Sequence, residues 1–162
     1  MGLTTQGGIY MATETNVHVR TGTLMRRLFS TKSIDDYLRQ NTQHLKTETF
    51  CECLRRHCLE KGLVAEHVIE HAQIERTYGH QLFNGTRNPS RDKVLQFAFG
   101  LGLSVEETQQ LLRSAAKSLL YPRIRRDAIV IYALKEHWKM TDVQEVLDEY
   151  HLSLLGGEGK NG

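Results

Sequence analysis

Apolar residues recur every three or four positions along this chain from residue 33 to residue 155. A repeat near 3.6 residues is that of an α-helix that buries one face. The whole chain of 162 residues has only two prolines, so few positions would interrupt such helices. These features predict an all-α fold. No apolar run approaches the roughly 18 residues that a membrane span requires, so we expect no membrane association.

Composition and pattern divide the chain into four predicted segments. These are a flexible tail over residues 1–32, a helical bundle over residues 33–118, a helical hairpin over residues 119–155, and a flexible tail over residues 156–162. The first segment is rich in Thr and Gly, and its apolar residues follow no period. Within it, Arg20, Arg26 and Arg27 could form a basic arm along DNA or part of a weak transit peptide. The bundle is predicted to start with a short helix capped at Ser33.

The stretch from Gly62 to Pro89 has the pattern of two short helices joined by a tight turn. The break lies at Ala72–Ile74, and the second helix runs from Arg76 to Phe83. Asn84-Gly85 then ends this helix, because Gly and Asn most readily adopt the left-handed conformation that helix ends use. This spacing is typical of a helix-turn-helix, in which the second helix enters the major groove of DNA.

Residues 50–112 resemble the phage-repressor-like (Cro/XRE-type) helix-turn-helix family. The resemblance covers the helix before Gly62, the helix-turn-helix and the segments that follow it. Its specific feature is the link Gly85-x-Arg87-x-Pro89-Ser90, followed by an apolar helix and Leu101-Gly102-Leu103-Ser104. The resemblance implies a lambda-repressor-like bundle and a sequence-specific transcriptional regulator that binds double-stranded DNA. Such a regulator would act in the cytoplasm of a bacterium, on the nucleoid, or belong to a phage.

The resemblance also implies roles for residues in and after a recognition helix at about residues 75–83. The residues expected to read base edges are Arg76, Thr77, Tyr78 and Gln81, and those expected to contact the DNA backbone are Asn84, Thr86 and Arg87. Their chemistry fits, since Arg can pair bidentately with guanine and Gln with adenine. His80 lies roughly one position off this face. The alternative is that these residues are ordinary solvated polar side chains.

Several positions depart from the family pattern. Ala65 stands where the family usually has a Gln that contacts phosphate. Gln73 stands where its turn usually has Gly, which would cost about 1 kcal/mol if the backbone is left-handed there. Gly79 replaces a large apolar residue, and we hypothesise that Ile69 fills the space that it leaves.

Acidic residues also flank the motif, at Glu66, Glu70 and Glu75, and would oppose DNA if they faced it. Together with Ala65 they leave open an alternative function. In that alternative the helix-turn-helix is a scaffold, and the chain is a protein-interaction adaptor or an antitoxin-like partner.

The sequence repeats itself at an offset of 35 residues. Ser90–Phe99 aligns with Arg125–Leu134, and each copy begins with an Arg-Asp pair before an apolar helix. Each copy is therefore predicted to be a helical hairpin. The second helices of the two copies have capping signatures, Ser104-x-x-Glu107 and Thr141-x-x-Gln144.

The link between the copies holds the densest basic cluster, Arg123, Arg125 and Arg126. This cluster could be a basic patch for phosphate or for an acidic partner, or a solvated linker. The helix after it is apolar nearly all round, at Ile129–Tyr132, which requires central burial or a partner. We therefore expect a homodimer or another protein partner to bind through this C-terminal hairpin.

The sequence lacks the motifs of an enzyme. It has no Gly-rich phosphate loop, no nucleophile elbow and no His-Glu-x-x-His, so we expect neither catalysis nor a cofactor. The three cysteines indicate a reducing compartment rather than a disulfide framework. Cys53 and His57 are four residues apart, but a zinc site normally needs four ligands, so buried thiols are favoured over a metal site. The net charge of +2 does not by itself indicate nucleic acid.

Overall fold

A computed structural model describes residues 19–157 of the protein. All regular secondary structure in this range is helical, which confirms the all-α prediction. The chain divides between Thr47 and Glu48 into two compact units. None of the helices in the described range is long and apolar enough to cross a membrane. The predictions for residues 1–18 and 158–162 lie outside the described residues.

The first unit is a pair of short helices held together by polar contacts. It consists of α1 (Thr21–Ser30), α2 (Ile34–Asn41) and a 3-10 turn (Thr42–His44). Ser33 caps α2, as predicted. The Tyr37 hydroxyl donates to the carbonyl of Leu24, and Arg27 donates to the side chain of Asn41 at 2.8 Å. The prediction of a flexible tail is therefore wrong over α1, which buries no residue and is ordered by these contacts instead. The predicted start of the bundle at residue 33 is also wrong, since α2 belongs to this unit.

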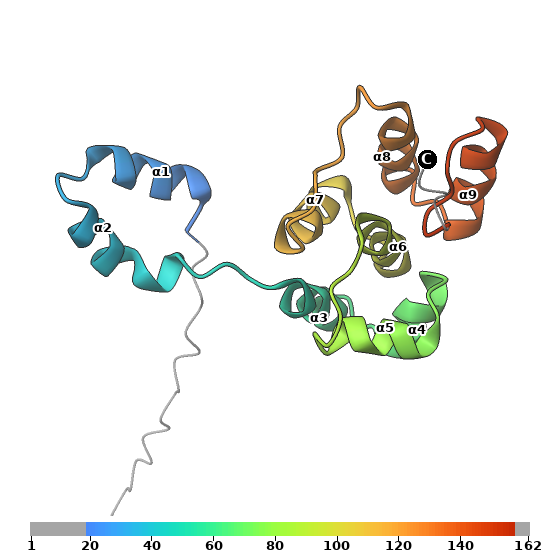
Figure 1. Cartoon of the computed structure of the whole chain (residues 1–162), viewed down its shortest axis with the longest axis horizontal. Coiled ribbons are helices and arrows are strands. Elements are labelled where there is room, and N and C mark those ends of the chain that lie inside the picture. Colours follow the sequence, from blue (N-terminus) through green and yellow to red (C-terminus); the bar gives the residue numbers. More distant parts are fainter. Residues whose placement is uncertain (1–18, 158–162) are drawn as a thin grey trace, which may run out of the picture. The chain divides into compact units, whose positions relative to one another are not determined.

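The second unit is built around α6. Its helices are α3 (Phe50–Glu60), α4 (Ala65–His71), α5 (Arg76–Phe83), α6 (Arg91–Leu101), α7 (Val105–Ser114), α8 (Arg125–Lys135) and α9 (Met140–Glu149). Helix α6 packs against α4, α7 and α9 (Figure 1). The buried ring of Phe97 on α6 contacts Phe50 of α3 and Phe83 of α5, with ring centroids 6.0 and 5.5 Å apart. Gly100 allows the close approach of α4, because a Cβ there would lie 2.6 Å from the carbonyl oxygen of Val68.

One of the two predicted helix caps of the repeated hairpins is present. The backbone N–H of Glu107 donates to the Ser104 hydroxyl at 3.1 Å, and the Ser104 N–H donates to the Glu107 carboxylate at 2.8 Å. The predicted cap at Thr141 is wrong, because α9 starts earlier and Thr141 lies in its first turn. Instead, the N–H of Lys139 donates to the carboxylate of Asp142 at 3.1 Å, which satisfies one of the donors at the start of α9.

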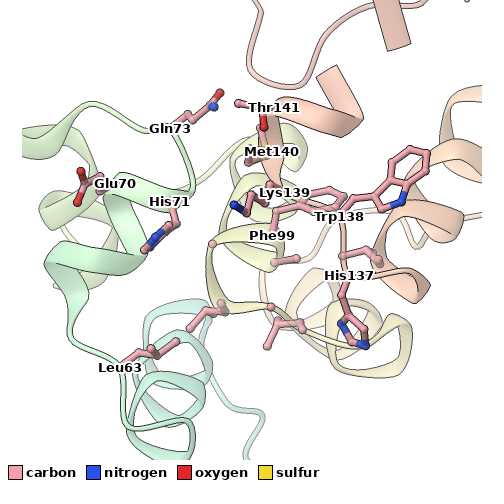
Figure 2. Close-up of a pocket in the computed structure, with 16 residues that line it drawn as sticks. Leu63, Glu70, His71, Gln73, Phe99, His137, Trp138, Lys139, Met140 and Thr141 are labelled. Atoms are coloured by element: carbon pink, nitrogen blue, oxygen red, sulfur yellow. The ribbon is translucent and has the colours of Figure 1, made fainter. Parts of the chain in front are cut away.

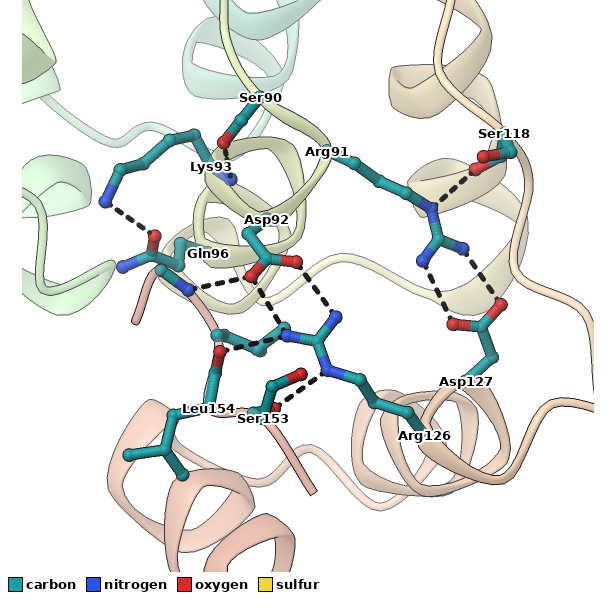
Figure 3. Close-up of polar contacts among 12 residues, drawn as sticks. Ser90, Arg91, Asp92, Lys93, Gln96, Ser118, Arg126, Asp127, Ser153 and Leu154 are labelled. Carbon is teal, nitrogen blue, oxygen red and sulfur yellow. Dashed lines mark hydrogen bonds and ion pairs between the residues drawn. The ribbon is translucent and has the colours of Figure 1, made fainter. Parts of the chain in front are cut away.

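The Arg-Asp pairs of the two sequence copies bind each other reciprocally (Figure 3). Arg91 of the first copy donates both outer nitrogens to the carboxylate of Asp127, at 3.0 and 2.9 Å. Arg126 of the second copy does the same to Asp92, at 2.9 Å for both bonds. Each arginine also donates to two carbonyl groups at the end of its own copy, Ser118 and Leu119 for Arg91, and Ser153 and Leu154 for Arg126.

A second set of contacts obeys the same offset of 35 residues. The side-chain amide of Gln109 donates to the carbonyl of Leu120 at 3.0 Å and accepts from its N–H at 2.8 Å. Gln144 makes the same two bonds with Leu155, both at 2.8 Å. The α6–α7 and α8–α9 hairpins are therefore equivalent structures, as the repeat predicted. The second hairpin packs into the same unit as the first and is not a separate body.

Candidate nucleic-acid interface

Helices α4 and α5 are joined by a turn whose backbone is left-handed at Gln73, with φ of 55°. This confirms the strained turn that the sequence indicated at this position. The side chain of Gln96, buried on α6, donates to the carbonyl of Ala72 at 3.0 Å and to that of Gln73 at 3.4 Å. A residue other than Gly in this conformation is costly and must be held by its surroundings. The contact with α6 supplies that support and fixes α5 relative to the core.

The outer face of α5 contains three of the four residues that were predicted to read bases. Arg76 and Thr77 are exposed on this face, and Gln81, one turn after Thr77, is half-buried at its edge. Tyr78 lies elsewhere: its side chain packs against the hydrophobic core. Tyr78 is half-buried in this packing, and its role in reading bases stays a prediction.

The acidic residue before α5 is used within the motif. Glu75 caps the helix, and its carboxylate accepts from the N–H groups of Thr77 and Tyr78 at 2.9 and 2.8 Å. These backbone hydrogen bonds lower the pKa of the Glu75 carboxyl below its ordinary value. A charged carboxylate at a helix N-terminus also stabilises the helix dipole. Glu75, one of the acidic residues that flank the motif, therefore has a structural role.

Glu66 on α4 links two polar side chains of α5. Its carboxylate lies 2.5 Å from Nε of Arg76 and 2.8 Å from Nε2 of His80. The hydrogen bond from His80 is the largest influence that lowers the pKa of the Glu66 carboxyl. The ion pair places Arg76 in a defined position on the outer face of α5. Sequence reasoning missed this role of Glu66 and His80, because the contact depends on how α4 crosses α5 and no local spacing signals it.

The segment after α5 contains one positively charged side chain, that of Arg87, that is not used in an ion pair within the described residues. The Asn84 side chain accepts from the hydroxyl of Thr86 at 2.9 Å, which shapes the loop, and Gly85 has φ of 80°. The backbone N–H of Arg87 donates to the carbonyl of Gln81 at 3.2 Å. The Arg87 side chain is exposed and makes no hydrogen bond or ion pair with another residue within residues 19–157. Of the three residues that were expected to contact the DNA backbone, Arg87 has the charge suited to a phosphate.

The predicted basic patch is not a single surface. Arg126 is engaged by Asp92 and its side chain is largely buried, so its inclusion in the patch was wrong. The Arg125 guanidinium lies over the ring of Tyr150, 5.1 Å from its centroid, and Arg123 is exposed. The Arg-Asp repeat explains the difference, because one arginine of the cluster is needed to join the hairpins.

A groove of about 500 Å³ lies on another side of the α4–α5 turn (Figure 2). Its walls include His71 and Gln73 from the end of α4 and the turn, Phe99 from α6, and Trp138 and Lys139 from the link between α8 and α9. The two residues from the turn side therefore face this groove. They are not part of the outer face of α5.

Two of the three cysteines are buried in the described residues, and Cys51 is half-buried. Cys53 and Cys58 are buried on α3, and burial raises the pKa of each thiol to about 11. His57, on the same helix, is buried as well. Residues 19–157 contain no group of three or more His, Cys, Asp or Glu side chains that could hold a metal ion. The interpretation of Cys53 as a buried thiol is confirmed.

Comparison with known proteins found no match to a family model, to a curated protein or to a solved structure.

Proposed function

We propose that this chain is a sequence-specific regulator of transcription that binds double-stranded DNA and inserts α5 into the major groove. In this proposal α3–α7 form a bundle of the phage-repressor-like type. The observation that carries the proposal is the outer face of α5, where Arg76 is held by Glu66 and is followed along the helix by Thr77 and Gln81. These side chains offer hydrogen bonds suited to base edges.

The residues around α5 also support its insertion into the major groove. Gln96 fixes the turn before the helix and Glu75 caps its start, so α5 is a rigid element rather than a frayed one. Arg87 follows the helix with a free guanidinium, at the position where a backbone phosphate would flank the groove. Contacts to phosphate would fix the register of the protein on the DNA, and contacts from α5 to base edges would supply the sequence specificity.

The test is binding of the purified full-length chain to fragments of genomic DNA at two salt concentrations, followed by anisotropy measurements on the selected site. We expect a few fragments to be selected and the affinity to fall steeply with salt. Arg76→Ala should cost about 1–3 kcal/mol on the selected site and relax the preference at one base pair. Arg87→Ala should weaken binding to all sequences alike and reduce the salt slope by about one.

Arg113→Ala is the matched control, because Arg113 is an exposed arginine on α7 and its side chain makes no hydrogen bond or ion pair in the described range. It removes the same charge and should leave base preference unchanged. Weak and equal binding to all fragments, or equal effects of the Arg76 and Arg87 variants on every sequence, would contradict base reading by α5. The helix-turn-helix would then be a scaffold for a protein partner.

A further inference from the structure

The two hairpins are equivalent structures, but they differ in how far one apolar face is covered. In the first hairpin, one apolar face is completely covered, and Val94, Phe97 and Leu111 are fully buried. The cover comes from the earlier helices, since Phe97 contacts Phe50 on α3 and Phe83 on α5. This face is a part of the hydrophobic core of the second unit.

The second hairpin keeps the same face but leaves it open. The residues 35 positions later are Ile129, Tyr132 and Val146, of which the first and last are half-buried and Tyr132 is 52% exposed. Tyr132 stacks edge-on against Trp138 with ring centroids 5.5 Å apart. Together with Tyr150, which is 50% exposed, they line a shallow groove of about 370 Å³. No helix within residues 48–157 covers this groove as α3 and α5 cover the first.

The chemistry of this open face is that of a protein interface. Tyrosine, tryptophan and arginine are enriched where a few residues dominate binding between proteins. Tyr132, Trp138 and Tyr150 lie on this face with Arg125, whose guanidinium packs on the ring of Tyr150. A contiguous apolar patch of this kind on a protein usually marks a binding site.

The charged residues at the two ends of this face indicate which kind of partner would fit it. Arg125, Ile129, Tyr132 and Glu136 follow one another along one side of α8 at helical spacing, with a cation at one end and a carboxylate at the other. The pair Arg125 and Glu136 and the pair Ile129 and Tyr132 are both centred between residues 130 and 131. An antiparallel copy of the same helix would therefore place each Arg125 opposite the other Glu136, and each Ile129 opposite the other Tyr132.

We propose that this face binds a second copy of the chain, with α8 antiparallel to α8 of the partner about a two-fold axis. Such an isologous interface uses the same surface on both protomers. The internal contacts of the two charged residues allow this exchange. Glu136 is paired with Lys135 at 3.3 Å in an exposed ion pair, which contributes little to stability.

The test is analytical ultracentrifugation of the full-length protein without DNA, so its outcome is independent of the proposed DNA binding. We expect a dimer that Tyr132→Glu converts to monomer while the helical circular dichroism spectrum is retained. Arg125→Glu and Glu136→Arg should each raise the dimer dissociation constant about tenfold or more, because each variant places like charges opposite one another. The double variant Arg125→Glu/Glu136→Arg should restore dimerisation. An equimolar mixture of the two single variants should form a heterodimer.

Two results would exclude self-association through this face. One is a wild-type chain that remains monomeric at every concentration. The other is a dimer that is unaffected by Tyr132→Glu but dissociated by Phe29→Glu, which introduces the same charge at an exposed aromatic residue of α1. The second result would assign self-association to the first unit. A mixture of the single variants that forms no heterodimer would exclude the antiparallel arrangement.

Discussion

The side chain of Ile69 on α4 occupies the space that a side chain at position 79 on α5 would need. A Cβ at Gly79 would lie 2.6 Å from Cγ2 of Ile69, 2.8 Å from Cγ1 and 2.9 Å from Cδ1. These distances are far below the 3.5–4.0 Å at which carbon atoms pack favourably. The hypothesis that Ile69 fills the space left by Gly79 is confirmed, and the contact fixes how closely α5 lies against α4.

We predict that Gly79→Ala destabilises the protein, although alanine is intrinsically favoured over glycine in a helix by about 1 kcal/mol. Ile69→Ala should cost roughly 2–5 kcal/mol through the cavity that it opens. In the double variant, the new methyl group at position 79 enters that cavity, so its loss should be smaller than the sum of the single losses. Urea unfolding followed by circular dichroism measures all three, and additive losses or a more stable Gly79→Ala variant would contradict the packing.

The reciprocal ion pairs between the hairpins lead to a second prediction, based on their unequal burial. The Asp127 side chain is 2% exposed, whereas that of Asp92 is 26% exposed. Water screens the charge of a buried carboxylate less than that of a partly exposed one, and breaking a buried ion pair costs about 3–5 kcal/mol. Asp127→Asn should therefore reduce the free energy of unfolding by about this amount. Asp92→Asn is nearly isosteric, breaks the equivalent pair, and should cost less. Equal losses in chemical denaturation would show that burial does not determine the strength of these pairs.

The helices of the second unit could be predicted from sequence because each has an apolar face of its own. The apolar helix predicted between Ser90 and the segment Leu101–Ser104 is observed over Arg91–Leu101. Helix α1 was not predicted, although Leu24, Met25, Leu28 and Phe29 recur at helical spacing, and none of them is buried. The repeat of 35 residues predicted two equivalent hairpins. It did not predict the exchange of Arg91 and Arg126 between them, since residues 34 to 36 positions apart meet only in the folded unit.

The candidate site could be predicted only where one helix determines it. Arg76, Thr77 and Gln81 were predicted from their positions along α5, whereas the packing of Tyr78 against the core depends on neighbouring helices. Glu66 could not be found in this way, because its contact with Arg76 joins two helices. Contacts between helices depend on the crossing geometry, which the local pattern does not contain.

The link between Glu66 and Arg76 provides a third prediction, which rests on the proposed DNA binding. Glu66→Gln removes a negative charge beside α5 and releases Arg76 and His80. We expect affinity for all DNA sequences to rise. We also expect the preference at the base pair that Arg76 reads to fall by about 1 kcal/mol. Glu70→Gln is the control, since Glu70 is exposed on the same helix and lines the groove beside the turn instead. Competition anisotropy with single-base variants of the selected site measures both effects. A Glu66→Gln variant with unchanged base preference would show that Glu66 does not orient Arg76.

The buried imidazole of His57 makes stability depend on pH. Both ring nitrogens are buried without a hydrogen-bond partner within the described residues, and burial lowers the pKa of His57 below its ordinary value. The unfolded chain therefore takes up a proton near pH 6.5, while the folded chain takes it up only at lower pH. Because the unfolded state binds more protons in this window, the free energy of unfolding should fall as pH is lowered from about 6.5. We predict that His57→Leu flattens this fall between about pH 6.5 and 5, above the range in which carboxyl groups titrate. His67→Gln, at an exposed histidine on α4, should keep the wild-type slope. Denaturant unfolding across this pH range measures the free energy of unfolding of each variant. A His57→Leu variant with the wild-type dependence on pH would assign the acid sensitivity to other groups.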